Sequence, residues 1–297
     1  MRKRIVIFIA LLMFIFPLAS CSEGESKSIT IGAQTYTEMK ILAYMYKELI
    51  EDQTDISVEV KEDLATSPIV LEGLQNGDLD IGTLLSGTIA NFTEIENPQD
   101  KQATWEQARD IFAGEEYNLK YLERLGYENT YAFTIRNDLA EEHGIEKVSD
   151  MKDIAGEFSA GFDTSWLERK YDGYPYFVET YQFEFGETNP MEIGLVYDAV
   201  KNREVDIVLA YTSDARITAF DLVTLEDDKH FFPPYDAAPI IRQELLDEYP
   251  EVEDAISPLV GRFTDESIRE LNGKVDLEGN DIEDVAIEYL KSENLIE

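Results

Sequence analysis

The side chains that usually carry out enzyme chemistry are few in this chain and are not spaced for it. Its 297 residues include two histidines, His143 and His230, and one cysteine, Cys21. No His/Cys cluster has zinc-site spacing, and the sequence has no Gly-x-Ser-x-Gly elbow or phosphate-binding glycine loop. We expect His143 at a helix C-terminus, where a cation complements the helix dipole, and a structural role for His230. The sequence therefore predicts a protein that is not an enzyme and binds no cofactor or metal.

Acidic side chains are so abundant that no single pair of them stands out as a site. The chain has 62 acidic and 25 basic residues, a formal net charge of −37 that opposes nucleic-acid binding. Pairs such as Asp227-Asp228 therefore give little support to a glycosidase. Residues 276–281 lack the order of an EF-hand, so we expect a turn there before a helix over 282–290. An extracellular hydrolase and a calcium-dependent adhesion protein are the alternatives from other classes.

The single cysteine stands at the end of a predicted export signal. Residues 2–4 are basic, residues 5–16 are apolar, and Leu18-Ala19-Ser20 precedes Cys21. This order is typical of a secretory signal, and the apolar run is too short to span a bilayer. A lone cysteine also cannot form a disulfide within the chain. We therefore predict a signal peptide over 1–20 and an exported protein.

The tetrapeptide Leu-Ala-Ser-Cys suggests how the exported chain is held at the membrane. It resembles the lipobox of bacterial lipoproteins, which implies that Cys21 is lipidated and becomes the mature N-terminus. A diacylated residue supplies the two chains that stable anchoring requires. The expected location is the outer face of the cytoplasmic membrane. An ordinary signal followed by a chance cysteine is the alternative.

The elements that would position a site alternate between strands and helices. Residues 21–28 comprise the cysteine and a small, polar segment that we interpret as a flexible tether. Residues 29–32 and 57–61 are predicted strands, and the apolar spacing over 38–50 predicts a helix between them. This alternation indicates an α/β fold.

Two segments of the chain are alike and hint at two lobes. Residues 75–81 and 201–207 share the order x-Asn-x-acid-apolar-Asp-Ile, and each follows the apolar spacing of a helix. Each leads through a strand to a turn of small residues, at 85–88 and 211–214. If the likeness is real, two similar α/β lobes face each other and a ligand binds beyond the strand ends. The alternative is that any helix–turn–strand unit would look alike.

Longer motifs are similar to those of one protein family. They are Asn129-Thr130-Tyr131-Ala132, Asp172-Gly173-Tyr174-Pro175, the run over 210–217 and, most specific, D-L-V…L-E-D-D-K…F-F-P-P-Y over 221–235. On these motifs the chain, from about 29 to 296, resembles the substrate-binding proteins of osmoprotectant ABC importers. These are the glycine betaine/carnitine/choline-binding lipoproteins.

The resemblance implies a fold, a function and a partner. The fold would be a two-lobed, hinged α/β structure of the periplasmic-binding-protein type (type II). Lobe I would comprise residues 29–128 and 229–297, and lobe II residues 129–228. The protein would capture a quaternary-ammonium solute outside the cytoplasm and deliver it to an ABC permease. A receptor for an amino acid or a polyamine is the alternative. A polyamine site would recruit carboxylates rather than aromatic rings.

The resemblance also implies the ligand-binding side chains. A trimethylammonium group has no N–H, so aromatic ring faces rather than hydrogen bonds must hold it. The residues that match the family's cage are Trp105, Tyr131, Tyr211 and Tyr235. Many relatives carry Tyr at the position of Trp105, and packing in the core is the alternative for this residue.

Two polar residues are candidates for the carboxylate end of the ligand. Gln34 and Thr88 each follow a predicted strand and lie beside a glycine or another small residue, which allows close backbone approach. Capping of the local turn is the alternative role for both. Some relatives have Tyr-Thr-Gly-Thr where this chain has Leu-Ser-Gly-Thr over 85–88, a difference that bears on which ligand is preferred.

Overall fold

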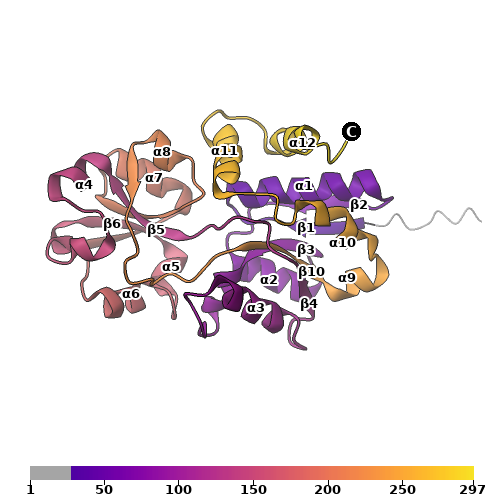
Figure 1. Ribbon diagram of the computed structural model, residues 1–297, viewed down its shortest axis with the longest axis horizontal. Helices are drawn as coiled ribbons and strands as arrows, with labels where there is room; N and C mark the ends of the chain where they lie inside the picture. The colour runs from indigo at the N-terminus through magenta and orange to yellow at the C-terminus, as the bar shows by residue number, and fades with distance from the viewer. Residues whose placement is uncertain (1–27) are drawn as a thin grey trace, which may run out of the picture.

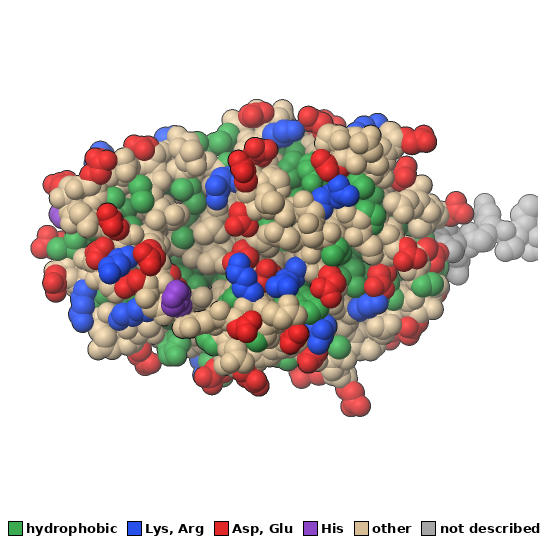
Figure 2. All heavy atoms as spheres, in the orientation of Figure 1, with side chains coloured by type: hydrophobic (Ala, Val, Ile, Leu, Met, Phe, Trp, Pro, Cys, Tyr) green, Lys and Arg blue, Asp and Glu red, His purple; other side chains and the backbone are tan. Residues whose placement is uncertain are grey.

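Two five-stranded sheets covered by helices form two lobes that lie side by side (Figure 1). The computed structural model describes residues 28–297. The predicted signal peptide, Cys21 and the tether up to residue 27 lie outside the described residues. Within 28–297, no helix is both long enough and apolar enough to cross a membrane. Acidic side chains are spread over both lobes on the face shown in Figure 2.

The first sheet combines strands from both ends of the described chain in the order β2-β1-β3-β10-β4. Its strands are β1 (Ser28–Gly32), β2 (Ser57–Lys61), β3 (Ile81–Leu85), β4 (Leu119–Tyr121) and β10 (Ala237–Arg242). β1 is parallel to β2 and β3, whereas β10 is antiparallel to β3 and β4. The predicted strands over 29–32 and 57–61 are confirmed, the first with one more residue at its start.

The second sheet repeats this arrangement with strands from the middle of the chain, in the order β7-β6-β8-β5-β9. Its strands are β5 (Tyr131–Arg136), β6 (Ser159–Asp163), β7 (Glu187–Met191), β8 (Ile207–Tyr211) and β9 (Leu222–Thr224). β6 is parallel to β7 and β8, and β5 is antiparallel to β8 and β9. The chain therefore crosses between the sheets twice, after β4 and after β9.

Helices cover both faces of each sheet (Figure 1). Around the first sheet lie α1 (Thr37–Gln53), α2 (Ser67–Asn76), η1 (Ser86–Asn91), α3 (Lys101–Phe112), α9 (Gln243–Glu248), α10 (Glu251–Ile256), η4 (Ser257–Leu259), α11 (Asp265–Asp276) and α12 (Ile282–Ser292). Around the second lie α4 (Asn137–His143), η2 (Val148–Met151), η3 (Ala155–Glu157), α5 (Thr164–Glu168), α6 (Tyr174–Tyr181), α7 (Ile193–Lys201) and α8 (Arg216–Ala219).

The helices begin and end where their sequences carry the appropriate signals. α4 ends at His143 and is followed by Gly144 in the left-handed region (φ 65°), so the predicted place of His143 is confirmed. α12 begins after Asp281, whose carboxylate accepts the N–H groups of Glu283 and Asp284. The helix predicted over 282–290 is confirmed and continues for two further residues.

The two segments that are alike in sequence occupy equivalent positions in the two sheets. The Asp80 carboxylate accepts the Thr30 N–H of β1 at 2.8 Å, and the Asp206 carboxylate accepts the Ser159 N–H of β6 at 2.9 Å. Each aspartate follows a helix and directly precedes a central strand, β3 or β8. The likeness between 75–81 and 201–207 is therefore structural.

Candidate functional site

Two tyrosines meet where the second sheet ends at the junction of the lobes. The antiparallel register of β5 and β8 pairs Tyr131, the first residue of β5, with Tyr211, the last residue of β8. Their ring centroids are 5.0 Å apart, and the Tyr211 hydroxyl lies 3.4 Å from that of Tyr131. Both side chains are buried. The register of this strand pair thus places two aromatic faces at one point.

The first lobe adds two more tyrosines to this cluster. Tyr36 directly precedes α1, and its ring centroid is 5.0 Å from that of Tyr211, whose hydroxyl donates to Tyr36 at 3.2 Å. Tyr235 precedes β10, and its ring meets that of Tyr131 edge to face at 5.5 Å. We call Tyr36, Tyr131, Tyr211 and Tyr235 the tyrosine cluster. It takes two rings from each lobe.

The position of Tyr235 depends on a glycine and a serine in η1. A Cβ added at Gly87 would lie 2.6 Å from Cε1 of Tyr235, so only glycine allows this ring to pack on the η1 backbone. The Ser86 hydroxyl donates to the carbonyl of Pro234 at 2.9 Å and accepts the Asp236 N–H at 3.0 Å. Ser86 thus holds the backbone of the residues directly before and after Tyr235.

Arg169 brings a largely buried positive charge to the tyrosine cluster. Its guanidinium donates to the hydroxyls of Tyr131 and Tyr235 at 3.0 and 2.9 Å. Its Cζ lies 5.6 Å from the Tyr131 ring centroid and 5.8 Å from that of Tyr235. Asp172 pairs with the same guanidinium at 2.6 Å and also accepts the Tyr235 hydroxyl. Two rings of the cluster and their hydroxyl oxygens therefore already contact a cation.

Burial keeps the phenols of the cluster neutral. Desolvation raises the pKa of Tyr131, Tyr211 and Tyr235 above the ordinary tyrosine value. Desolvation also raises the pKa of Asp172, although the Arg169 guanidinium opposes that rise. The rings consequently present neutral hydroxyls and electron-rich faces, which is chemistry suited to binding a cation.

A cavity of about 80 Å³ lies against these side chains. Besides the tyrosine cluster and Arg169, it is lined by Thr66, Ser67, Pro68, Leu85, Thr88, Asn91, Asn129 and Ser165. Four of the six residues predicted from the sequence line it, namely Tyr131, Tyr211, Tyr235 and Thr88. The hydroxyl and guanidinium donors along its wall could hold a carboxylate, and the rings could hold a cation.

Gln34 lies one residue behind the wall of this cavity. Its amide donates to the Thr83 carbonyl at 3.0 Å, and its oxygen accepts the Ser67 hydroxyl at 3.1 Å. Ser67 itself lines the cavity, whereas Gln34 is 1% exposed. Gln34 therefore orients a lining hydroxyl in this structure.

Trp105 lies in the core of the first lobe, away from the cavity lining. The spacing of Trp105, Ala108 and Phe112 places all three on the buried face of α3. The indole N–H donates to the Leu122 carbonyl at 3.3 Å, and the ring packs in a cluster of apolar side chains beneath the first sheet. In this structure Trp105 is therefore a core residue and does not line the cavity beside the tyrosine cluster.

Two residues that contact the rings, Tyr36 and Arg169, were not predicted from the sequence. Tyr36 follows Gln34 by two residues, so the same loop signal could have pointed to it. Arg169 lies three residues before Asp172, where one of the family-like motifs begins. The sequence pattern places these residues near the site, but only the fold shows that they contact the rings.

Comparisons with known proteins agree with this geometry. A family model described as the substrate-binding domain of the ABC-type glycine betaine transport system matches residues 27–292. The chain is 36% identical over 309 residues to the carnitine transport binding protein OpuCC of Listeria monocytogenes, covering 100% of this chain and 99% of that protein. It is 30% identical over 286 residues to a glycine-betaine-binding protein of Pseudomonas aeruginosa, covering 92% and 90% of the two chains.

A solved structure shows the same architecture. The crystal structure of a glycine betaine/carnitine/choline ABC transporter protein superposes with a TM-score of 0.74 at 33% identity. It covers 91% of this chain and 100% of that one. The predicted two-lobed α/β fold is therefore confirmed.

Proposed function

This chain belongs to the family of substrate-binding domains of ABC-type glycine betaine transport systems, and from that premise we propose that it captures a quaternary-ammonium osmolyte in the tyrosine cluster. Family membership, predicted from the motifs, makes it the extracytoplasmic solute-binding component of an importer that works with a permease. Glycine betaine, carnitine and choline are the candidate ligands, since relatives are named for them.

One observation carries the proposal: four tyrosines from two lobes form one cluster, and two of them, Tyr131 and Tyr235, already contact a cation. The Arg169 guanidinium lies within 6 Å of two ring centroids, the range in which a cation is attracted to an aromatic face. A trimethylammonium group would use the same faces without needing hydrogen bonds. Each such contact stabilises binding by about 0.5–2 kcal/mol, so four rings at the upper end of that range reach the roughly 8 kcal/mol of micromolar affinity.

The carboxylate of glycine betaine or carnitine would be held by Arg169 with Thr88. A guanidinium can donate two parallel N–H bonds to a carboxylate. Thr88 lines the same cavity on the first-lobe side. Choline has no carboxylate and would use the ring contacts together with neutral hydrogen bonds of its hydroxyl.

Ligand binding would also favour closure of the lobes. Tyr36 and Tyr235 come from the first lobe, whereas Tyr131 and Tyr211 come from the second. Only a closed arrangement places all four rings around one ligand, so the ligand stabilises that state. The closed lobes would then dock on the permease.

The experiment that tests this function is a calorimetric titration with glycine betaine, carnitine and choline. We expect micromolar binding of at least one ligand, weakened about 100-fold in the Tyr131→Ala/Tyr211→Ala double variant because two ring faces are lost. Tyr44→Ala is the control, because Tyr44 lies on α1 and its hydroxyl donates to Glu62 away from the cavity. Failure of all three ligands to bind at millimolar concentration would leave a solute receptor of another ligand class.

We further propose that the chain is anchored by lipid on Cys21, after removal of residues 1–20. The support is the Leu-Ala-Ser-Cys order that follows a short apolar run. Expression of the full chain with labelled palmitate should give a labelled protein, and Cys21→Ser should abolish the label. Equal labelling of both proteins would contradict the anchor.

A further inference from the structure

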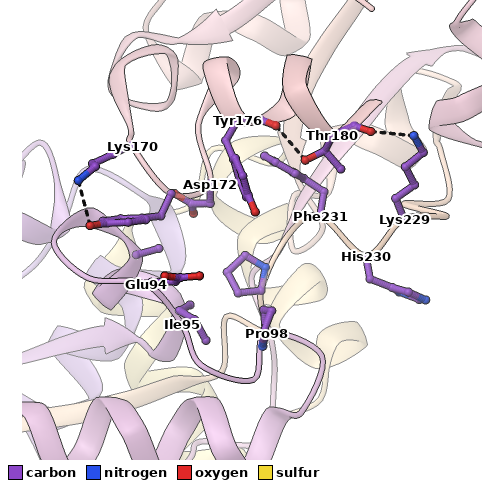
Figure 3. Close-up of a pocket in the computed structure, with 13 residues that line it drawn as sticks. Glu94, Ile95, Pro98, Lys170, Asp172, Tyr176, Thr180, Lys229, His230 and Phe231 are labelled. Carbon is purple, nitrogen blue, oxygen red and sulfur yellow. Dashed lines mark hydrogen bonds between the residues drawn. The ribbon is translucent and has the colours of Figure 1, made fainter. Parts of the chain in front are cut away.

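A second and larger cavity lies at the junction of the lobes. Its volume is about 410 Å³, within the range of pockets that hold small organic molecules. It is lined by the segment after η1, by the segment from Lys170 into α6, and by the second crossing between the sheets (Figure 3). Both lobes and one of their connections thus contribute to its wall.

One wall of this cavity carries a buried carboxylate oxygen without a partner. Asp172 is 2% exposed, and its Oδ2 accepts hydrogen bonds from Arg169 at 2.6 Å and from the Tyr235 hydroxyl. Its Oδ1 is buried and has no hydrogen-bond partner within residues 28–297. Leaving such an oxygen unpaired is unfavourable, so a donor in the cavity would be stabilised there. Oδ1 therefore marks a place for an N–H or O–H group.

A second carboxylate, from the other lobe, faces the same space. Glu94 follows η1 in the first lobe, and Figure 3 shows its carboxylate on the same side of the cavity as that of Asp172. The ammonium groups of Lys170 and Lys229 line the same cavity, and each donates to a neutral oxygen of its wall. Lys170 donates to the Tyr171 hydroxyl at 3.1 Å, and Lys229 donates to the Thr180 carbonyl at 2.8 Å. A cation between Asp172 and Glu94 would meet the Glu94 carboxylate and Oδ1 of Asp172, whose Oδ2 is already paired with Arg169.

The remaining wall is apolar and aromatic. Ile95 and Phe231 are buried, and the Tyr176 ring lies 5.8 Å from that of Phe231. Tyr176 is 47% exposed, which is high for a ring of this size. These side chains could cover the hydrocarbon part of a ligand whose charged end faces the carboxylates.

We propose that this cavity is a second solute site for a protonated primary amine with an apolar or aromatic body, its ammonium placed between Asp172 and Glu94. An ammonium with N–H groups can donate to Oδ1 of Asp172, whereas a quaternary ammonium cannot. The two cavities thus select opposite ligands, and they meet at Asp172, whose Oδ2 holds Arg169 and Tyr235 of the first site. This site does not depend on the ligand proposed for the tyrosine cluster.

The test uses phenethylamine and its N-trimethyl analogue as probes, titrated calorimetrically into the purified full chain at pH 7. We expect the primary amine to bind, also when glycine betaine is saturating, and the N-trimethyl analogue to bind at least tenfold more weakly under that saturation. Glu94→Gln should weaken amine binding about tenfold, because one charged partner is lost. Glu96→Gln is the control, since it makes the same charge change two residues along, outside the cavity lining.

Several results would overturn the second site. Displacement of the amine by glycine betaine, or its loss in the Tyr131→Ala/Tyr211→Ala variant, would place it in the tyrosine cluster instead. Equal effects of Glu94→Gln and Glu96→Gln would show that net charge alone matters. Absence of amine binding at millimolar concentration would mean that Oδ1 is satisfied by water only. Glycine betaine is also titrated into the same samples. Its binding tests the osmolyte proposal independently of the amine result.

Discussion

Arg169 would act in opposite ways on the two charged ends of a zwitterionic ligand. Its guanidinium lies against the faces of Tyr131 and Tyr235 and donates to both hydroxyls. A bound trimethylammonium group would compete for those faces, whereas a bound carboxylate would attract the guanidinium. The same side chain would therefore oppose one end of a bound ligand and stabilise the other. Its contribution should differ between ligands with and without a carboxylate.

We predict that Arg169→Gln weakens glycine betaine binding at least tenfold and changes choline binding far less. The reason is that glycine betaine loses a charge-assisted hydrogen bond, which is typically about 1.5–3 kcal/mol, whereas choline loses none. Isothermal titration with both ligands measures the difference. Arg109→Gln is the control, because Arg109 lies over the Trp105 ring at 5.0 Å, away from the cavity. Equal losses for the two ligands would contradict this role.

At the scale of residues, motifs predicted those site members that sit on regular elements or rigid turns. Tyr131 and Tyr211 are strand-end residues, and Tyr235 follows two prolines, so the neighbouring sequence determines where each ring emerges. Trp105 and Arg169 show the limit of such reasoning. The stripe of α3 turns Trp105 to the core, and the contacts of Arg169 depend on strands far away in the chain.

At the scale of elements, each lobe is held by one arginine–aspartate pair at the same place. Arg242 ends β10 and donates to Asp80 at 3.0 Å, and Arg136 ends β5 with its guanidinium 3.6 Å from Asp206. Each aspartate also accepts an N–H from the neighbouring parallel strand. One carboxylate thus joins three strands, and the same device occurs in both sheets.

We predict that Asp80→Ala lowers the free energy of unfolding by about 1–3 kcal/mol, because a strand N–H and a guanidinium both lose their acceptor. Chemical denaturation monitored by circular dichroism measures the change. Asp78→Ala provides the comparison, since Asp78 is exposed on the turn two residues earlier and its side chain is not part of this pair. If both variants lose the same stability, the carboxylate does not join the strands as described.

Sequence patterns predicted the elements whose own residues determine them. The helix over 38–50 and the strands over 29–32 and 57–61 carry clear periodicity, and all three are present. β7 contains Pro190 and little apolar alternation, so its strand conformation depends on pairing with β6. β4 and β9 have only three residues each and are likewise defined by the strands beside them. Such elements follow from tertiary pairing, which no local pattern encodes.

At the scale of the whole molecule, one buried carboxylate joins the two lobes. Glu38, in the first turn of α1, accepts hydrogen bonds from Asn129 in the first crossing and from the Ser213 hydroxyl after β8 at 3.0 Å. It also accepts from Asn272 of α11 at 3.1 Å. Burial raises the pKa of Glu38 to about 7, and the nearby Asp214 charge acts in the same direction. The junction of the lobes therefore binds a proton near neutral pH.

This raised pKa makes Glu38 a source of pH-dependent stability. Between the ordinary pKa of 4.5 and about 7, the folded chain keeps a proton that the unfolded chain releases. The contribution is complete below that window and is lost as pH rises through it, because the unfolded state then binds fewer protons. We predict that Glu38→Gln removes this loss, so the stability of the variant relative to wild type increases between pH 4.5 and pH 8 by up to about 3 kcal/mol.

Urea unfolding at several pH values measures this difference between variant and wild type. Glu59→Gln is the matched control, because Glu59 is an exposed residue of β2. The free energy of unfolding of Glu59→Gln should differ from that of wild type by the same amount at every pH in this range. A flat difference for Glu38→Gln as well would mean that Glu38 is ionised in the folded protein throughout.

The order of strands in the first sheet has a consequence for how the chain folds as it leaves the membrane. β10 lies between β3 and β4, yet it is made after the whole second sheet. A chain that emerges with its N-terminus first can thus complete the second lobe before β10 has paired with β3. An unpaired strand edge is a template for aggregation until it is filled. The edge of β3 therefore stays open to pairing with another copy of the chain until the last fifth of the chain, which contains β10, has folded.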